Sequence, residues 1–188
     1  MSDPDQRRRQ FESIALPLMQ ALYNTSLRLT ADGDEAADIV QETFLRAYRT
    51  FDNFRPGTNA KAWLFTILYS VFANRYHEAR RRPRIDAEAV EQLEAPASPE
   101  SDIALVAAWG SRWNPEVERA LRRLPEDFRT PLLLIDVEGL SYEEAATVLG
   151  CALGTVGSRL FRGRKLLYGM LQEYAHQAGF GKDSAPDP

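Results

Sequence analysis

The residues with the clearest chemical potential lie in the stretch GSRLFRGRK at positions 157–165. Serine and arginine supply hydrogen-bond donors, lysine adds a positive charge, and phenylalanine adds an apolar ring. Such groups can contact base edges and phosphates when a helix presents them to a major groove. Helical spacing directs six of these residues away from the apolar side: Gly157, Ser158, Phe161, Arg162, Arg164 and Lys165. We therefore predict that this side of the helix binds nucleic acid.

The opposite side of the same helix must be anchored in a core. Apolar or small residues recur there by alternating steps of four and three, which is the spacing of one buried stripe. They are Val156, Leu160, Gly163, Leu167 and Met170. On the predicted binding side, we expect glycine at position 157 to let a backbone approach closely.

A shorter helix precedes this one and meets it at a tight corner. Ser141 and Glu144 have the spacing of a capping box, and Gly150 can adopt the left-handed conformation that ends a helix. We expect four residues of the short helix to face inward: Tyr142, Ala145, Ala146 and Leu149. A short turn followed by a basic helix favours a DNA-binding helix-turn-helix. An ordinary helical hairpin with a solvated basic face is the alternative interpretation.

Two further amphipathic helices are predicted near the N-terminus. The first covers residues 11–29, and Pro17 is expected to kink or delimit it. Its apolar positions are Phe11, Ile14, Leu18, Leu22 and Leu29. The second covers residues 34–48 and directs inward Ala36, Ile39, Val40, Phe44, Ala47 and Tyr48. Its outward side is a mixed polar surface formed by Asp38, Gln41, Glu42, Leu45 and Arg46.

A third helix is predicted from Ala60, and residues 61–82 read KAWLFTILYSVFANRYHEARRR. The helix begins apolar and ends basic. Its core positions are expected to be Trp63, Ile67, Val71 and Phe72. Aromatic and cationic residues alternate further along, in the mix that stacks single-stranded bases: Tyr69, Arg75, Tyr76 and His77. The alternative is that these aromatic residues belong to the core.

The chain divides after the third helix. Prolines, small residues and acids between positions 83 and 114 indicate a flexible connector, with Trp109 and Trp113 anchoring its far end. Two helices at 115–124 and 126–137 should then pack beneath the helix-turn-helix, the second kinked at Pro131. The predicted fold is all-α, with two small helical domains (1–83 and 114–174), an acidic flexible linker (84–113) and a disordered tail (175–188).

Composition excludes several classes of protein. With 188 residues, of which 44% are hydrophobic, the chain has the make-up of a soluble globular protein. No apolar run reaches the roughly 18 residues that a membrane span needs, so we predict a cytoplasmic protein without membrane insertion. One cysteine and two histidines predict neither a disulfide nor a metal site, and packing suits Cys151 better than a redox role. Without a triad or a phosphate-binding glycine loop, we predict no enzyme and no cofactor.

The net charge of −4 argues at first against a nucleic-acid partner. The distribution of charge favours one, however, because arginine and lysine gather at positions 75–84 and 159–165, whereas acids gather at 32–42 and 86–102. Two basic surfaces separated by acidic segments are compatible with two separate contacts to nucleic acid.

Three long stretches carry a family resemblance: DEAADIVQETFLRAYRTFDNF, KAWLFTILYSVFANRYHEARRRP and LPEDFRTPLLLIDVEGLSYEEAATVLGCALGTVGSRLFRGRKLL. Together they resemble an extracytoplasmic-function (ECF) sigma factor of the sigma-70 superfamily. The resemblance covers about residues 11–83 and 114–171, which would be sigma domains 2 and 4. It implies a bacterial transcription initiation subunit that directs core RNA polymerase to promoters.

The resemblance also assigns residues by position. Binding to the clamp coiled coil of the largest polymerase subunit would fall to Asp38, Gln41, Glu42 and Leu45. Opening and holding the −10 element would fall to Trp63, Ser70, Asn74, Arg75, Tyr76, Arg80, Arg81 and Arg82. Reading the −35 element would fall to Thr155, Gly157, Ser158, Phe161, Arg162, Arg164 and Lys165. The flap of the second largest subunit, promoter DNA and an anti-sigma factor are the other implied partners.

Two rival interpretations remain at this point. The output domain of a two-component regulator shares the helix-turn-helix pattern, but it would follow a parallel α/β receiver domain, and the N-terminal half here is predicted to be helical. A sigma mimic, which sequesters an anti-sigma factor without touching DNA, would not need two basic promoter-binding surfaces.

Overall fold

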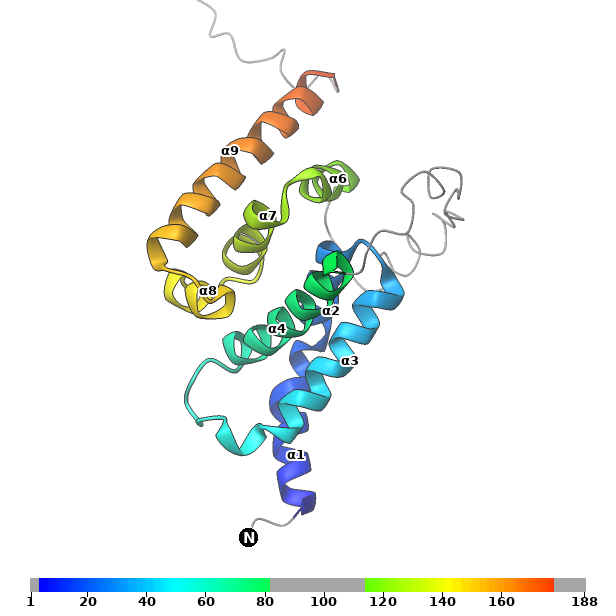
Figure 1. Cartoon of the computed structure of the whole chain (residues 1–188), viewed down its shortest axis with the longest axis vertical. Coiled ribbons are helices and arrows are strands. Elements are labelled where there is room, and N and C mark those ends of the chain that lie inside the picture. The colour runs from blue at the N-terminus through cyan, green and yellow to red at the C-terminus, as the bar shows by residue number, and fades with distance from the viewer. Residues whose placement is uncertain (1–3, 82–113, 178–188) are drawn as a thin grey trace, which may run out of the picture.

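The computed structural model describes residues 4–81 and 114–177, and all regular elements in these two ranges are helical (Figure 1). The prediction of an all-α fold is therefore confirmed. The predicted linker at 84–113, Trp109, Trp113 and Arg82 lie outside the described residues, as does the predicted tail from residue 178 onward.

The first domain begins with two consecutive α-helices. Helix α1 (Pro4–Ala15) and helix α2 (Met19–Thr30) are separated by the 3-10 turn η1 (Leu16–Leu18), in which Pro17 lies near the start. Proline lacks the amide hydrogen that a continuing α-helix requires, so the predicted break at Pro17 is confirmed. The α2 helix ends at Ala31, which adopts φ 59°.

Helices α3 (Gly33–Arg49) and α4 (Ala60–Arg81) complete the first domain, with the 3-10 turn η2 (Phe51–Asn53) between them. The Asp32 side chain caps α3 by accepting a bond of 2.8 Å from the Glu35 amide. Asn59 caps α4 in the same way, since its Oδ1 lies 3.0 Å from the Lys61 amide nitrogen. The helices enclose a core that includes Leu22, Ile39, Leu64, Phe65 and Leu68.

The second domain contains helices α6 (Pro115–Arg123), α7 (Glu126–Leu132), α8 (Tyr142–Leu149) and α9 (Leu153–Gln177). A π-helical turn, η3 (Leu133–Val137), follows α7 directly. Pro131 lies just before this turn, so the predicted irregularity takes the form of a switch in hydrogen bonding. Helices α6 and α7 both pack against α9, as expected. Helix α9 continues to Gln177, three residues past the predicted domain end at 174.

The helix-turn-helix corner agrees with the prediction except at Tyr142. Ser141 Oγ accepts from the Glu144 amide at 3.1 Å, and Glu144 Oε2 accepts from the Ser141 amide at 2.8 Å, which completes the capping box. Gly150 ends α8 with φ 60°. Tyr142, predicted to face inward, is 39% exposed because it is the first residue of α8 and lies off the stripe formed by Ala145 and Val148, both buried.

The buried stripe of α9 is also confirmed, and the backbone of α7 approaches α9 closely at one glycine of this stripe. Val156 and Leu160 are fully buried. A Cβ on Gly163 would lie only 2.9 Å from the backbone oxygen of Phe128 in α7. At Gly157 the nearest atom of the protein would be Tyr142 Cε1 at 4.0 Å, so no other backbone of this domain approaches there, and close approach of a nucleic-acid backbone to Gly157 stays a prediction.

The two domains pack against each other through α4. This helix lies against α3 on one side and against α8 on the other (Figure 1). Tyr69 of α4 is more than half-buried, with Glu126 and Arg159 of the second domain among the charges that act on it. The buried residues of both domains consequently form one continuous apolar cluster.

Candidate protein and nucleic-acid interfaces

The outward side of α3 presents the four residues predicted to bind a protein partner. Asp38 and Gln41 are exposed, and Leu45 is an exposed apolar side chain. Glu42 Oε1 accepts a bond of 2.6 Å from Arg46 Nε, and this bond lowers the pKa of Glu42. This side of α3 therefore combines fixed negative charge with one accessible leucine.

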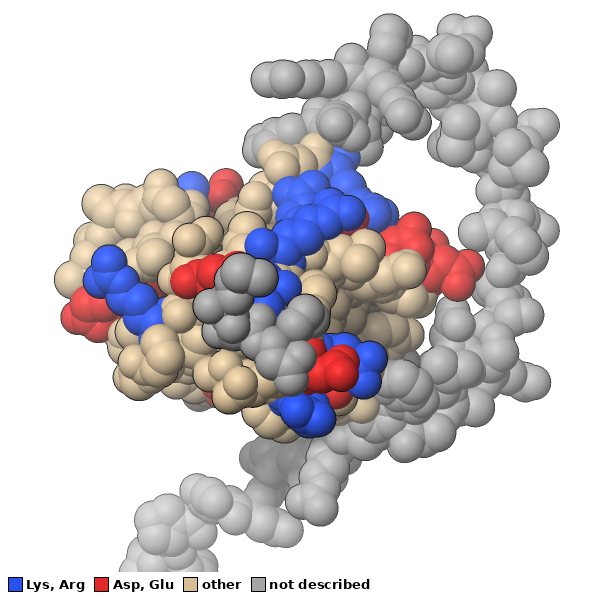
Figure 2. Space-filling model, turned by 90° about the horizontal axis from the view of Figure 1, so that it is seen from below, with Lys and Arg blue, Asp and Glu red and all other residues tan. Residues whose placement is uncertain are grey.

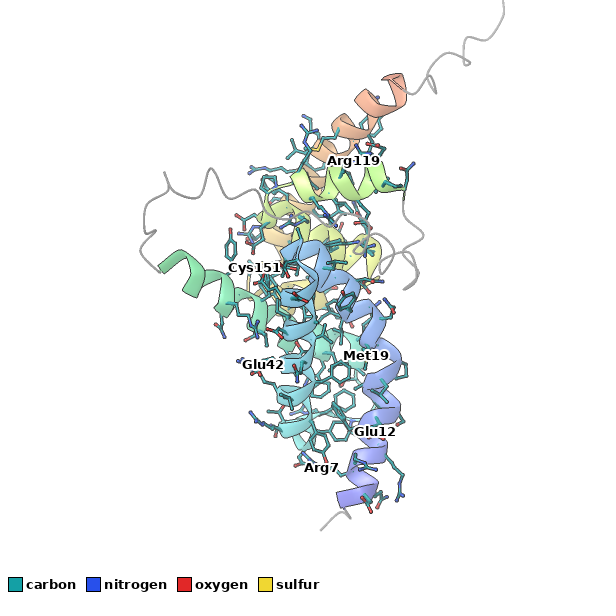
Figure 3. All side chains as sticks on the ribbon, turned by 90° about the vertical axis from the view of Figure 1, so that its right-hand side faces the viewer. Arg7, Glu12, Met19, Glu42, Arg119 and Cys151 are labelled. Atoms are coloured by element: carbon teal, nitrogen blue, oxygen red, sulfur yellow. The ribbon has the colours of Figure 1, made fainter. Side chains whose placement is uncertain are left out.

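An apolar groove of about 630 Å³ runs between this helix and the α1–α2 segment. Gln41 and Leu45 line one wall, and Leu16 and Met19 line the other, where both are exposed. Figure 3 shows Glu12 and Met19 on the α1–α2 side and Glu42 on the α3 side. Such a groove can accept apolar side chains from a partner helix.

Aromatic rings form the floor of this groove. The Phe11 ring centroid lies 6.2 Å from that of Phe44 and 5.2 Å from that of Tyr48, both edge-on. The Arg7 guanidinium lies 4.6 Å from the Tyr48 ring centroid and donates to the Tyr48 carbonyl oxygen and to Asp52. The Tyr48 ring is therefore held by Phe11 and by Arg7, and these contacts give the groove floor a defined shape.

The groove itself was not predicted from the sequence. Phe11, Phe44 and Tyr48 were assigned to the core, and Leu16 and Met19 fall outside the predicted apolar stripe. Those two off-stripe apolar residues beside Pro17 were the available signal, because apolar side chains that gather on the surface often mark a site for a partner.

The predicted −10 residues on α4 do not all share one face. Positions 63, 70 and 74 follow helical spacing, so Trp63, Ser70 and Asn74 lie on the same side, and the last two are exposed. Trp63 is half-buried, with its ring centroid 4.9 Å from that of Phe54. Together they form a polar strip bordered by an aromatic pair.

The other predicted −10 residues lie elsewhere or outside the described part. Tyr76 points to the opposite side of α4, where its ring stacks 5.8 Å from Phe72. Arg75 NH1 lies 3.6 Å from Asp38 Oδ2, which joins the edge of this site to α3. Arg80 and Arg81 are in the last turn of α4, and their side chains lie outside the described residues, as does Arg82.

The surroundings of Tyr69 and Tyr76 favour the interpretation that these residues belong to the core over the interpretation that they stack on bases. Burial raises the pKa of the Tyr69 phenol, and the nearby Glu126 raises it further. Arg129, in the second domain, has Tyr76 among the groups that act on its charge. The Tyr69 phenol therefore lies beside charges of the second domain, and the Tyr76 ring packs on Phe72 against the core.

The exposed side of α9 brings together most of the predicted −35 residues. Ser158, Phe161, Arg162 and Lys165 are exposed, and Phe161 reaches 70%. Ser158 Oγ donates to the Thr155 carbonyl oxygen at 3.0 Å, so Thr155 supports this surface from the first turn. A hydroxyl, a ring and two cations on one helix face match what base and phosphate contacts require.

Arg164 differs from the other predicted −35 residues because it is engaged within the protein. Its Nε lies 2.9 Å from Asp136 Oδ2, its NH2 contacts the other Asp136 oxygen, and these bonds raise the pKa of Arg164. Arg159 is similarly paired, with NH2 3.0 Å from Asp127 Oδ1. The two ion pairs fasten α9 to η3 and α7.

The surface charge is divided among groups rather than gathered on one face. Figure 2 shows the largest group of lysine and arginine side chains at the upper centre of this view, with smaller groups at the left and near the bottom, among acidic and uncharged surface. Among residues 4–81 and 114–177, no three or more histidine, cysteine, aspartate or glutamate residues are grouped so that they could hold a metal ion. No helix in the described part of the chain is long and apolar enough to cross a bilayer.

Comparison with protein families gives two matches that together cover most of the described chain. The model of Sigma-70 region 2 matches residues 16–82, and the model of Sigma-70, region 4 matches residues 115–167. The first match includes the α4 strip and the groove residues from Leu16 onward, and the second ends within α9 after the exposed face.

Individual proteins are similar over nearly the full length. The ECF RNA polymerase sigma factor EcfG of Rhodopseudomonas palustris is 39% identical over 157 residues, covering 84% of this chain and 81% of that protein. The RNA polymerase sigma-H factor of Pseudomonas aeruginosa is 34% identical over 175 residues, covering 91% of each. The sigma factor RpoE of Bartonella quintana, solved with the anti-sigma factor NepR, matches with TM-score 0.67 and 32% identity over 87% of this chain and 98% of that one.

Proposed function

The chain belongs to the ECF RNA polymerase sigma factors of the sigma-70 family, and from this membership we propose which surface performs each step of promoter-specific initiation. Sigma factors are transcription initiation factors, and we propose that this one acts without catalysis or a cofactor of its own. Because it would work together with bacterial RNA polymerase on the chromosome, we place it in the cytoplasm.

We assign core-polymerase binding to α3 and the groove beside it. Asp38, Gln41, Glu42 and Leu45 would contact the clamp coiled coil of the largest subunit. The groove supports this assignment because Gln41 and Leu45 line it and its apolar walls suit a helical partner. We assign binding of the flap of the second largest subunit to the second domain.

We assign −10 recognition to the strip on α4. Ser70 and Asn74 supply exposed polar groups, and Trp63 with Phe54 supplies an aromatic edge on which an unpaired base can stack. The arginine run at positions 80–82 would neutralise phosphates beside the melted bases.

We assign −35 recognition to Ser158, Phe161, Arg162 and Lys165 on α9, with Thr155 and Gly157 at the edge of the surface. The ion pair with Asp136 makes Arg164 a positioning residue rather than a base contact, although its exposed position still allows a phosphate contact. The observation that supports the whole assignment is that an exposed polar strip on α4, an exposed basic face on α9 and an apolar groove beside α3 occupy three separate places on one chain.

We also propose an anti-sigma factor as a regulatory partner. The Bartonella quintana relative was solved with such a partner, and its similarity to this chain extends over both domains. A groove with exposed Leu16, Met19 and Leu45 is a surface that an inhibitor could cover in competition with polymerase.

Run-off transcription with purified core polymerase tests the proposed function. The chain should direct start-specific transcription from a promoter library, whereas core enzyme alone should not. A regulator output domain would bind DNA without initiating transcription, and a sigma mimic would do neither. Failure to support initiation with any core enzyme and promoter set would contradict the assignment.

A further inference from the structure

An exposed tyrosine continues the proposed −35 face of α9 toward the C-terminal end of the helix. Tyr168 is 64% exposed, and Gln172, about one turn further on, is exposed as well. Starting from Phe161, the positions 165, 168 and 172 follow by steps of four, three and four, so these four residues lie in one line along the helix. The face that presents the Phe161 ring therefore does not end at Lys165.

The opposite side of this half of α9 belongs to the core. Leu167 and Met170 pack against the buried cluster, and helices α6 and α7 both lie against α9. In Figure 1 these two helices lie on one side of α9, and the other side of α9 forms an edge of the second domain. Tyr168 and Gln172 are thus turned to solvent like the proposed −35 residues, although the match to Sigma-70 region 4 ends at residue 167.

The charge of α9 suits a polyanion over this whole length. From residue 153 to residue 172 the sequence contains three arginines and one lysine, and no aspartate or glutamate. Arg159 and Arg164 are paired with carboxylates of α7 and η3, on the side where α9 packs on the domain. DNA that lies along these turns of α9 therefore meets no carboxylate of the helix that would repel its phosphates.

Tyr168 and Gln172 form a hydrogen bond that prepares the tyrosine to donate. Gln172 Nε2 donates to the Tyr168 hydroxyl oxygen at 2.8 Å. Because this oxygen acts as an acceptor, the hydroxyl hydrogen can be donated to another group. A hydroxyl that accepts one bond is polarised and donates a second one more strongly. Phosphate oxygens only accept hydrogen bonds, so the pair matches the chemistry of a backbone phosphate.

The distance along α9 places this pair at the border of the major groove. At a rise of 1.5 Å per residue, Tyr168 and Gln172 lie about 15 and 21 Å beyond Ser158. The major groove is about 12 Å wide and winds around the duplex, so a straight helix leaves it within this distance. When residues 158–162 contact base edges, the turns at 168–172 consequently lie beside the sugar–phosphate backbone.

We propose that Tyr168 donates a hydrogen bond to a backbone phosphate that flanks the −35 element, and that Gln172 positions the hydroxyl. This inference rests on the proposed function, because it takes the exposed face of α9 as the −35 face. A phosphate contact carries no base information. It strengthens binding at every −35 sequence and fixes where α9 is anchored along the groove.

Fluorescence anisotropy with the full chain bound to core polymerase tests this contact. The probe is a labelled promoter fragment that the wild type uses in run-off transcription. Versions of this fragment carry single methylphosphonates in place of successive phosphates across and beside the −35 element. Tyr168→Phe removes only the hydroxyl and should weaken binding to the unmodified fragment about threefold to tenfold. At one or two phosphates outside the element, a methylphosphonate should weaken binding of the wild type more than that of Tyr168→Phe, by about the same factor.

Gln172→Ala tests whether the glutamine acts through the tyrosine. It should weaken binding by a smaller factor than Tyr168→Phe, because the hydroxyl remains but is no longer oriented. The double variant should bind like Tyr168→Phe alone, since no hydroxyl is left to position. Losses that add in the double variant would contradict the positioning role of Gln172.

Leu166→Ala provides a matched control. Leu166 is 41% exposed and lies two residues before Tyr168, which places it on a different side of the same helix. This variant should keep the wild-type affinity and the wild-type response to every methylphosphonate. Circular dichroism should show wild-type helix content for all variants, because each changed side chain is exposed.

Three results would overturn the proposed contact. One is equal affinity of Tyr168→Phe and the wild type for the unmodified fragment. Another is a loss in Tyr168→Phe that is the same at every methylphosphonate position, which would assign Tyr168 to a protein contact within the polymerase complex. A third is a Leu166→Ala variant that loses as much affinity as Tyr168→Phe. A wild type that initiates transcription from no promoter with core enzyme would instead refute the proposed function.

Discussion

The close contact between α9 and α7 predicts opposite effects of the same substitution at two glycines of one helix. Alanine in place of glycine stabilises a helix interior by about 0.8–1.0 kcal/mol. At Gly169 no atom lies within 4 Å of the added Cβ, so Gly169→Ala should show this gain. At Gly163 the Cβ would lie 2.9 Å from the Phe128 backbone oxygen and 3.4 Å from Phe128 Cβ.

The Gly163 contact cannot be relieved by rotating a side chain, because the nearest atom belongs to the backbone of α7. Forcing extra volume into such a site costs about 1–3 kcal/mol, which matches or exceeds the gain in helix propensity. Gly163→Ala should therefore be less stable than Gly169→Ala by about 1–3 kcal/mol in free energy of unfolding. For a chain of this size that corresponds to a melting temperature roughly 3 to 9 °C lower.

Thermal unfolding followed by circular dichroism measures the difference directly. Gly157→Ala serves as a second control, since its Cβ would meet only Tyr142 Cε1 at 4.0 Å and it should behave like Gly169→Ala. If Gly163→Ala melts at or above Gly169→Ala, α7 does not approach α9 as closely as described. The proposed −35 face of α9 would then have to be reassigned.

Three further predictions follow from the two domains. Leu160→Ala should lower the free energy of unfolding by roughly 2–5 kcal/mol in a denaturant titration. Arg162→Ala should leave the free energy of unfolding unchanged and weaken binding to −35 DNA by about 1–3 kcal/mol in a fluorescence anisotropy assay. The reverse pattern would mean that the buried face and the proposed DNA-binding face of α9 are exchanged. Leu45→Asp should reduce affinity for core polymerase in a titration while keeping the wild-type melting temperature, because Leu45 is 47% exposed, and equal affinity would remove the groove from the docking surface. Ser141→Ala should lower stability by about 1 kcal/mol through loss of the capping box, measured by urea unfolding, and no loss would mean that the cap is replaced by water.

The structural features that were predicted correctly from the sequence are those that depend on residues close together in one helix. The stripe of Val156 and Leu160, the capping box at Ser141 and the break at Pro17 all follow from spacings of a few residues, and all three are confirmed. Even there, Tyr142 was misplaced because helical periodicity does not show where the first turn begins. The close approach of the α7 backbone to Gly163 was not predicted, because spacing along α9 does not show where another backbone packs against it.

Features that depend on distant parts of the chain could not be predicted in this way. The groove requires knowing how the α1–α2 segment crosses α3, and the pair Arg28–Glu118 joins residues 90 positions apart. Each of these charged residues was compatible with a solvated helix face when taken alone. For Tyr69 and Tyr76 the sequence left both base stacking and the core open, and support for the core interpretation comes from residues far along the chain.

The bond between Asn59 and Glu144 has a practical consequence for recombining domains from different relatives. Each residue also caps a helix of its own domain, so neither can be exchanged to suit a new neighbour without changing a local helix start. A chimera that joins this first domain to the second domain of a relative keeps Asn59 but takes the residue at position 144 from the other parent. Engineered hybrids should therefore be built with positions 59 and 144 taken from the same parent, or else screened for altered packing of the two domains even where both halves fold.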